Sequence, residues 1–199
     1  MAMPDLPWAN LEVGGFTENS RLDASGKQWG FSFTAPLTTT YTSCGFVTSA
    51  NSTAPTYNIG IQADSSGTPT GTFIGTSGSV SAASNYSWQF GTISSSIIAN
   101  TKYWLVLSYN SGTIGASNYM AVRTKNDFKQ YRSYDFSEDK NMNASFYNGT
   151  SWTLQNKSPI FMVDDATNRY GQVWEGIALT GINSGGGQKQ TFNNLTNNV

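Results

Sequence analysis

The chain of 199 residues contains no histidine and only one cysteine, Cys44. The lack of histidine excludes Ser-His-Asp triads, Cys-His pairs and the usual histidine-containing zinc sites. A single cysteine cannot form an internal disulfide, and strand alternation places Cys44 on the same face as Phe46. We therefore expect Cys44 to be a small buried hydrophobic residue rather than a reactive thiol.

Charged residues are also scarce, at 12% of the chain against roughly 25% in an ordinary soluble protein. The formal net charge is −1, and no dense run of Lys and Arg is present to displace counterions from phosphates. No apolar stretch approaches the roughly 20 residues that a membrane-spanning helix needs. We therefore expect neither nucleic acid as a partner nor insertion into a membrane.

The acidic residues form no pattern that marks a catalytic pair. The only glutamates are Glu12, Glu18, Glu138 and Glu175, and none stands in a recognisable acid–base motif. We therefore predict that the protein is not an enzyme and that it needs no cofactor.

Three aspartates are weak candidates for calcium, which needs only oxygen ligands. Asp64 precedes two serines, and Asp164 and Asp165 stand together near Asn168. A second interpretation explains them better. Asp64 is then a turn residue that accepts hydrogen bonds from its own backbone, and the aspartate pair ends a strand and blunts the sheet edge.

The residues that are abundant indicate β-structure. Ser, Thr, Asn and Gly supply most of the polarity, and aromatic residues make up 14% of the chain. Apolar and polar residues alternate in 28–33, 56–63 and 86–90, as in half-buried strands. The segment 102–109 is apolar on both faces, which predicts a central strand, and we expect its Trp104 and also Trp88 to lie in the core.

Turn residues separate these segments from further predicted strands. The Asn148-Gly149 pair is the strongest hairpin signal in the chain. The further strands are expected at 41–49, 72–80, 119–124, 144–147, 151–154, 159–163 and 173–180.

Many short strands with regular turns predict an all-β fold, an antiparallel β-sandwich of jelly-roll type with extended terminal arms. We expect an N-terminal arm over 1–27, the sandwich over 28–180 with a long loop or insertion at 126–143, and a C-terminal arm over 181–199. Each arm either lies against a partner in an assembly or is frayed.

The order of several motifs resembles jelly-roll β-sandwich modules of surface proteins and of phage virion proteins. The motifs include Gly67-Thr68-Pro69-Thr70-Gly71, the strand Tyr103-Trp104-Leu105-Val106-Leu107, and Asn148-Gly149-Thr150-Ser151-Trp152. The likeness covers roughly residues 37–165. It implies a non-catalytic protein, which is either a decoration or tail-surface component of a virion or similar to a carbohydrate-binding module.

Sugar recognition would require exposed aromatic side chains with amide neighbours. The best candidates are Trp152 and Tyr147 with Asn148 and Gln155, although cross-strand packing also explains Trp152. The candidates on the charged segment are Tyr131 and Tyr134.

Two functions agree with these features. The first is a structural protein on the surface of a virion, such as a phage capsid decoration or tail-surface component, which assembles with other virion proteins or with copies of itself. It agrees with the absence of catalytic groups, the low charge, the arm-like ends and an N-terminus that lacks the basic and apolar regions of a signal peptide. The second is a carbohydrate-binding or adhesin module that is extracellular or on a cell surface, which implies glycans as partners and a signal that has been removed.

Overall fold

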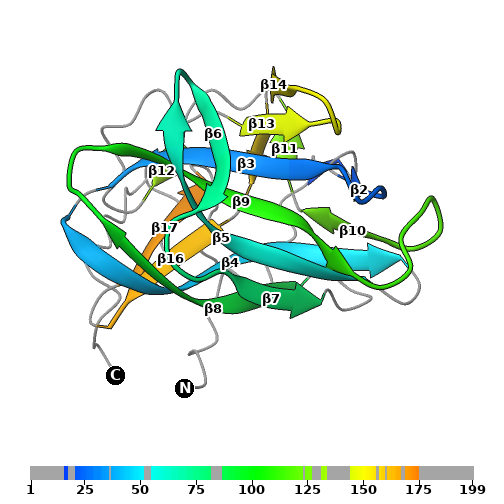
Figure 1. Ribbon diagram of the computed structural model, residues 1–199, viewed down its shortest axis with the longest axis horizontal. Coiled ribbons are helices and arrows are strands. Elements are labelled where there is room, and N and C mark those ends of the chain that lie inside the picture. Colours follow the sequence, from blue (N-terminus) through cyan, green and yellow to red (C-terminus); the bar gives the residue numbers. More distant parts are fainter. Residues whose placement is uncertain are drawn as a thin grey trace, which may run out of the picture.

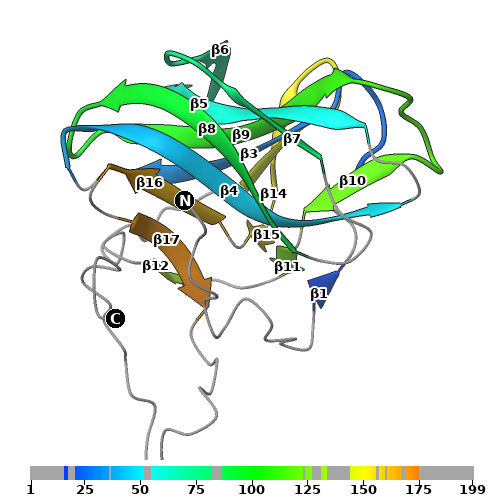
Figure 2. The same ribbon diagram turned by 90° about the horizontal axis from the view of Figure 1, so that it is seen from below.

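The computed structural model describes residues 16–17, 21–35, 37–51, 55–81, 87–122, 124–126, 131–133, 144–155, 157–159, 161–166 and 169–174. Every regular element in these ranges is a β-strand, and every strand pairing is antiparallel (Figure 1). Two seven-stranded sheets lie one above the other in Figure 2. The predicted all-β sandwich is therefore confirmed.

The first sheet is built around the long strand β4, and we call it the β4 sheet. One edge of β4 pairs with β8, and its other edge pairs with β16 and then with β10. The strands of this sheet are β2 (Arg21–Leu22), β4 (Thr39–Asn51), β8 (Ser87–Ile97), β10 (Tyr119–Val122), β12 (Tyr131–Ser133), β16 (Phe161–Asp165) and β17 (Arg169–Trp174).

The second sheet, the β9 sheet, has the predicted central strand between β3 and β5. Its order is β14-β13-β3-β9-β5-β6, and β7 also pairs with β5. Its strands are β3 (Gln28–Thr34), β5 (Thr56–Ser65), β6 (Thr68–Phe73), β7 (Gly78–Ser81), β9 (Lys102–Ser111), β13 (Ala144–Tyr147) and β14 (Trp152–Gln155).

A small third sheet, in the order β1-β11-β15, extends from the β4 sheet. It consists of β1 (Phe16–Thr17), β11 (Thr124–Asn126) and β15 (Lys157–Pro159). Strands β11 and β15 stand one residue away in sequence from β10 and β16, so strands that are neighbours in the chain belong to two different sheets.

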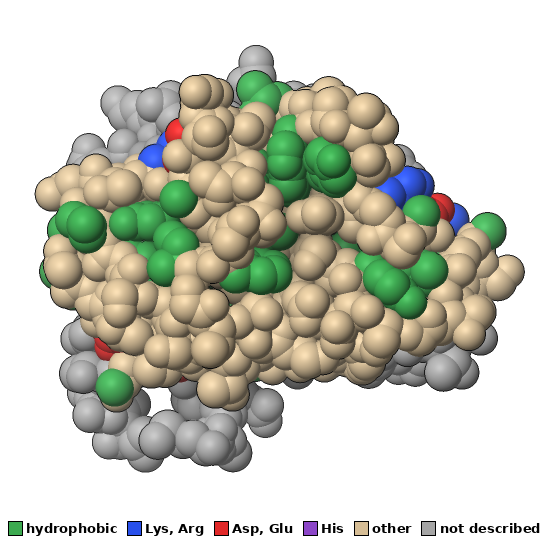
Figure 3. Space-filling model, viewed as in Figure 1, with side chains coloured by type: hydrophobic (Ala, Val, Ile, Leu, Met, Phe, Trp, Pro, Cys, Tyr) green, Lys and Arg blue, Asp and Glu red, His purple; other side chains and the backbone are tan. Residues whose placement is uncertain are grey.

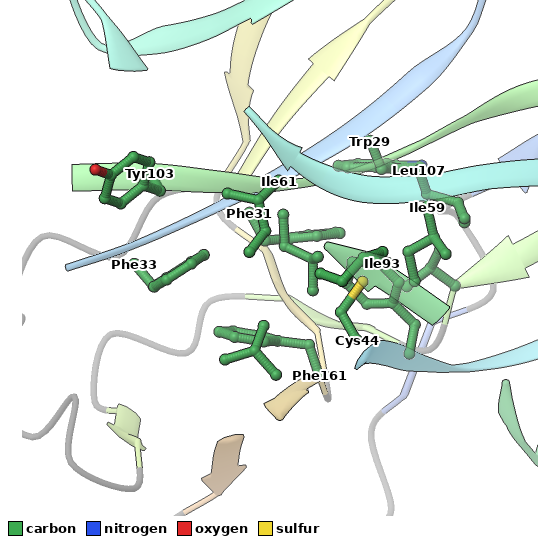
Figure 4. Close-up of a cluster of buried hydrophobic side chains, with 14 of the residues drawn as sticks. Trp29, Phe31, Phe33, Cys44, Ile59, Ile61, Ile93, Tyr103, Leu107 and Phe161 are labelled. Atoms are coloured by element: carbon green, nitrogen blue, oxygen red, sulfur yellow. The ribbon is translucent and has the colours of Figure 1, made fainter. Parts of the chain in front are cut away.

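The core lies between the two seven-stranded sheets, and alternate side chains of their strands fill it (Figure 4). Phe31, Ile59 and Leu107 enter from the β9 sheet and meet Cys44 and Phe161 from the β4 sheet. The side chain of Cys44 is fully buried, as expected. Burial raises the pKa of its thiol far above the ordinary value, so the thiol stays protonated and inert.

Tyr57 connects the two sheets with its hydroxyl group. From β5 it crosses the core, donates a hydrogen bond to the carbonyl of Leu22 (2.6 Å) and accepts one from the N–H of Met120 (3.1 Å). Strand β2 is only two residues long, and its pairing with β10 is held by this buried hydroxyl. Because Leu22 lies in the core, the sandwich includes residues before position 28, within the range predicted for the N-terminal arm.

Several boundaries differ from the sequence predictions. The single strand expected at 72–80 is two strands, β6 and β7, because Gly75 adopts φ +68° and turns the chain between them. Within the predicted insertion at 126–143, Tyr131–Ser133 forms β12. Residues 1–15, 18–20, 127–130, 134–143 and 175–199 lie outside the described residues, so both arms stay predictions.

Candidate functional site

The β13–β14 hairpin brings together the two best sequence candidates, Tyr147 and Trp152. They are directly opposite each other, with ring centroids 5.2 Å apart and planes tilted by 46°. The adjacent Phe146 packs against the core residue Trp29, so alternation points Tyr147 away from the core. Tyr147 and Trp152 are both half-buried on the outer face of the β9 sheet.

Asn148 shapes the turn of this hairpin. Its Oδ1 accepts hydrogen bonds from the N–H groups of Thr150 (2.9 Å) and Ser151 (3.0 Å), and Gly149 has φ +102°. This is the side-chain turn expected of Asn before Gly. The amide oxygen of Asn148 is therefore engaged by the backbone, and its amide N–H₂ is the group left for a ligand.

Trp152 rests on a small apolar cluster outside the main core. The position where Gly30 would carry a Cβ atom is 3.4 Å from Trp152 Cζ3, 3.3 Å from Trp104 Cε3 and 2.9 Å from Pro69 Cγ. Pro69 arrives on the β5–β6 hairpin, which folds back over this face (Figure 1). Glycine at position 30 thus permits the two hairpins to meet over β3.

Trp104 is fully buried, but it lies under this cluster rather than between the sheets. Its neighbours in β9, Tyr103 and Leu105, belong to the core, so alternation points Trp104 outward. The expectation that Trp104 is a core residue is therefore correct for its burial and wrong for its location.

Asp64 fixes the cluster through both carboxylate oxygens. Trp104 Nε1 donates to Oδ1 (2.7 Å), the N–H of Gly67 donates to Oδ2 (3.1 Å), and Lys102 Nζ is 3.7 Å from Oδ1. The turn role predicted for Asp64 is confirmed. Because these protein donors occupy both oxygens, Asp64 is a poor calcium ligand in this arrangement.

The other calcium candidates lie on β16. Asp165 is nearly buried and accepts a hydrogen bond from Thr39 Oγ1 (3.2 Å), and Asp164 is its half-buried neighbour. Among the described residues, no three His, Cys, Asp or Glu side chains gather in a group that could hold a metal ion.

The remaining sugar-binding candidates do not join Trp152. Gln155 pairs with Ala144, a core residue, so its side chain points to the opposite face of β14 from Trp152, and its Nε2 donates to the carbonyl of Thr153 (3.3 Å). Tyr131 belongs to β12 of the other sheet, and Tyr134 lies outside the described residues. Among the binding residues predicted from the sequence, Asn148 is therefore the only one that places an amide group beside the aromatic pair.

The outer face of the β9 sheet carries few charged side chains (Figure 3). Hydrophobic side chains gather there over β3 and β13, which is the region of the hairpin. Leu154, which shares the face of Trp152 on β14, is 60% exposed. We call Tyr147, Trp152 and Leu154 the hairpin patch.

A second aromatic pair lies on the outer face of the β4 sheet, although the sequence interpretation assigned one of its members, Trp88, to the core. Trp88 stacks on Phe90, with centroids 5.3 Å apart and planes 17° apart, and both are half-buried. Phe90 covers Gly45, which has no side chain to obstruct the ring. Alternation predicted that Trp88 and Phe90 share a face, but not which face. The missed signal is Gly45 in a strand interior, which indicates close approach by another group.

Within the described part of the chain, no helix is long and apolar enough to cross a membrane. Comparison of the chain with known protein families, with curated proteins and with solved structures finds no match.

Proposed function

We propose that the protein is a non-catalytic structural component of a virion surface, of the decoration or tail-surface type found in phages. In this function it assembles with other virion proteins or with copies of itself. The resemblance of its motif order to virion jelly-roll modules supports this assignment, and the β-sandwich agrees with that resemblance.

The observation that carries the proposal is the hairpin patch. Leu154 is 60% exposed beside the half-buried Trp152 and Tyr147, and the hairpin 144–155 contains no charged residue. Proteins usually protect a sheet edge with a charged side chain, especially Lys, or with Pro, because an apolar edge invites contact with a second chain. An uncharged apolar edge on a rigid sandwich is suited to assembly.

The test is to locate the chain in purified particles. Virions from the source would be banded on a density gradient, and the chain would be quantified by mass spectrometry and located by immunogold electron microscopy. We expect a fixed copy number per particle and labelling on the particle surface. Absence of the chain from intact particles would refute the virion assignment.

Glycan recognition is the second candidate function, favoured by the geometry of the aromatic pair. Aromatic rings provide apolar faces for sugar rings, while the Asn148 amide N–H₂ lies at the same turn and can donate to hydroxyl groups. A glycan array followed by calorimetry would test this function. We expect Trp152→Ala to abolish binding while circular dichroism shows that the variant is still folded, and Trp88→Ala, the matched loss on the opposite sheet, to retain binding. Equal loss in both variants, or no glycan bound by the wild type, would contradict this assignment.

A further inference from the structure

The two lateral sides of the sandwich differ in how their edges are protected. On one side, β7 of the β9 sheet closes onto β8 of the β4 sheet. Thr76 and Ser94 exchange two backbone hydrogen bonds there (3.2 and 3.3 Å). A Cβ atom on Gly78 would be 2.6 Å from the Cα of Gly91, so glycine permits the contact. This side offers little free edge for another chain.

The opposite side of the β9 sheet ends in β14, and none of the described strands pairs with its outer edge. The hairpin is closed by the hydrogen bond from the N–H of Asn148 to the carbonyl of Ser151 (3.3 Å). Hydrogen-bonded and non-hydrogen-bonded pairs alternate along an antiparallel ladder, so Tyr147–Trp152 and Ser145–Leu154 are non-hydrogen-bonded pairs. The backbone N–H and C=O groups of Trp152 and Leu154 therefore point away from β13, toward the open edge.

This arrangement is complementary to itself. If two copies of β14 pair antiparallel about a two-fold axis at Thr153, Trp152 of each copy is opposite Leu154 of the other. Both residues lie on the same face and both direct their backbone groups outward, so each pair exchanges two hydrogen bonds. The exposed Leu154 is then covered by an indole ring, which is a favourable cross-strand contact. No charge in the hairpin would face its own copy across the axis.

We propose that β14 is a self-association edge, at which two copies of this chain join their β9 sheets through an isologous contact centred on Thr153. This inference rests on the proposed function and names the element that performs the assembly. A four-residue strand buries less than the roughly 1,200 Å² of a standard stable interface, so the contact is weak in solution and is reinforced by repetition in an assembly.

Sedimentation velocity of the full chain over about 10 to 500 µM tests the contact, since weak interfaces dissociate in this range. We expect a concentration-dependent monomer–dimer equilibrium, which Leu154→Lys weakens at least about tenfold by blunting the edge and removing two Trp–Leu contacts. The matched control is Ile98→Lys, because Ile98 is 63% exposed against 60% for Leu154 and directly follows β8 of the other sheet. Ile98→Lys should leave the dimer intact. A wild type that is monomeric throughout, or equal effects of the two lysine variants, would overturn the proposal.

A cysteine at the two-fold axis tests the register. Thr153 is exposed and would be opposite its own copy in a non-hydrogen-bonded pair, with Cα atoms about 4.5 Å apart, close enough for a disulfide. Under mild oxidation with diamide, Thr153→Cys should give a cross-linked dimer, whereas Thr92→Cys, an exposed position on β8, should not. The native Cys44 is buried and adds no background. Equal cross-linking of both variants, or dimers without the Thr153 cross-link, would refute the two-fold pairing at this residue.

The virion function and the β14 contact can each be refuted without refuting the other. Particles that contain Leu154→Lys at the normal copy number would refute β14 as the assembly edge while the virion function stands. A dimer that behaves as expected, from a chain that is absent from particles, would refute the virion function while the β14 contact stands.

Discussion

The hydroxyl of Tyr57 makes a quantitative prediction about the sandwich. Substitution of Tyr57 by Phe keeps the ring, which also packs edge-on against Tyr109 with centroids 6.3 Å apart, and removes only the oxygen atom. The carbonyl of Leu22 and the N–H of Met120 then lose their partner in a region where both residues are fully buried. Each unpaired buried group costs about 1–3 kcal/mol, and partial closure of the gap between β2 and β10 recovers some of this. We therefore expect the free energy of unfolding to fall by about 2–4 kcal/mol, a large part of the 5–15 kcal/mol typical of a domain.

Urea unfolding monitored by tryptophan fluorescence measures this change, as a lower midpoint with an unchanged slope. The control is Tyr109→Phe, whose hydroxyl donates to the carbonyl of Gly112 (2.7 Å) at an exposed turn, where water can replace it. We expect that control to lose less than about 1 kcal/mol. If the two variants were equally stable, the hydroxyl of Tyr57 would not hold β2 in the sheet as the geometry indicates.

Three further predictions concern pH, packing and reactivity. Burial raises the pKa of Tyr57 from 10.0 to about 12, so the unfolded chain ionises first as the pH rises. The contribution of Tyr57 to stability is therefore intact below pH 10 and is lost as the pH rises from 10 to about 12, a decline that Tyr57→Phe should reduce in pH-dependent urea unfolding. Gly45→Ala should destabilise the protein by about 1–3 kcal/mol, because the new methyl group overlaps the ring of Phe90, whereas Gly115→Ala, which has open space around it, should be neutral in the same assay. Cys44 should resist iodoacetamide at pH 8 in the folded protein and react in urea, as measured by mass spectrometry; rapid labelling of the folded protein would contradict its burial.

The strands could be predicted from the sequence because alternation is a local signal. Strands β3, β5 and β9 and the Asn148-Gly149 hairpin occur close to the predicted positions, since side-chain alternation and turn residues act over a few positions. The division at Gly75 was missed, because a single glycine in a run of Ser and Thr gives a weak turn signal.

The location of the large aromatic residues could not be predicted in the same way. Trp104 is apolar and buried, yet its cover is the β5–β6 hairpin with Pro69, not the opposite sheet. Alternation assigns two sets of side chains to two faces, but it does not state which face meets the other sheet when both sets are apolar. Trp88 was placed in the core for a different reason: 86–90 alternates apolar with polar residues, and its apolar set was expected to face inward, whereas Trp88 lies on the outer face. For the binding candidates, proximity in sequence associated Gln155 with Trp152, whereas the odd separation of three residues on one strand places them on opposite faces.

Glycines in the strand interiors connect these observations. A Cβ atom at Gly30, Gly45 or Gly60 would face away from the main core. Bulky side chains from other strands cover these positions: Pro69 and Trp152 cover Gly30, Phe90 covers Gly45, and Phe73 covers Gly60. A side chain at any of these three positions would lift its cover from the sheet. The glycines therefore create small apolar clusters on the outer faces, and these clusters orient the aromatic rings that remain partly exposed. Because the hairpin patch is supported by Gly30 and Trp104 rather than by a loop, it presents a pre-ordered surface, which lowers the entropy cost of binding a partner. A rigid, uncharged edge of this kind is what self-association through β14 requires.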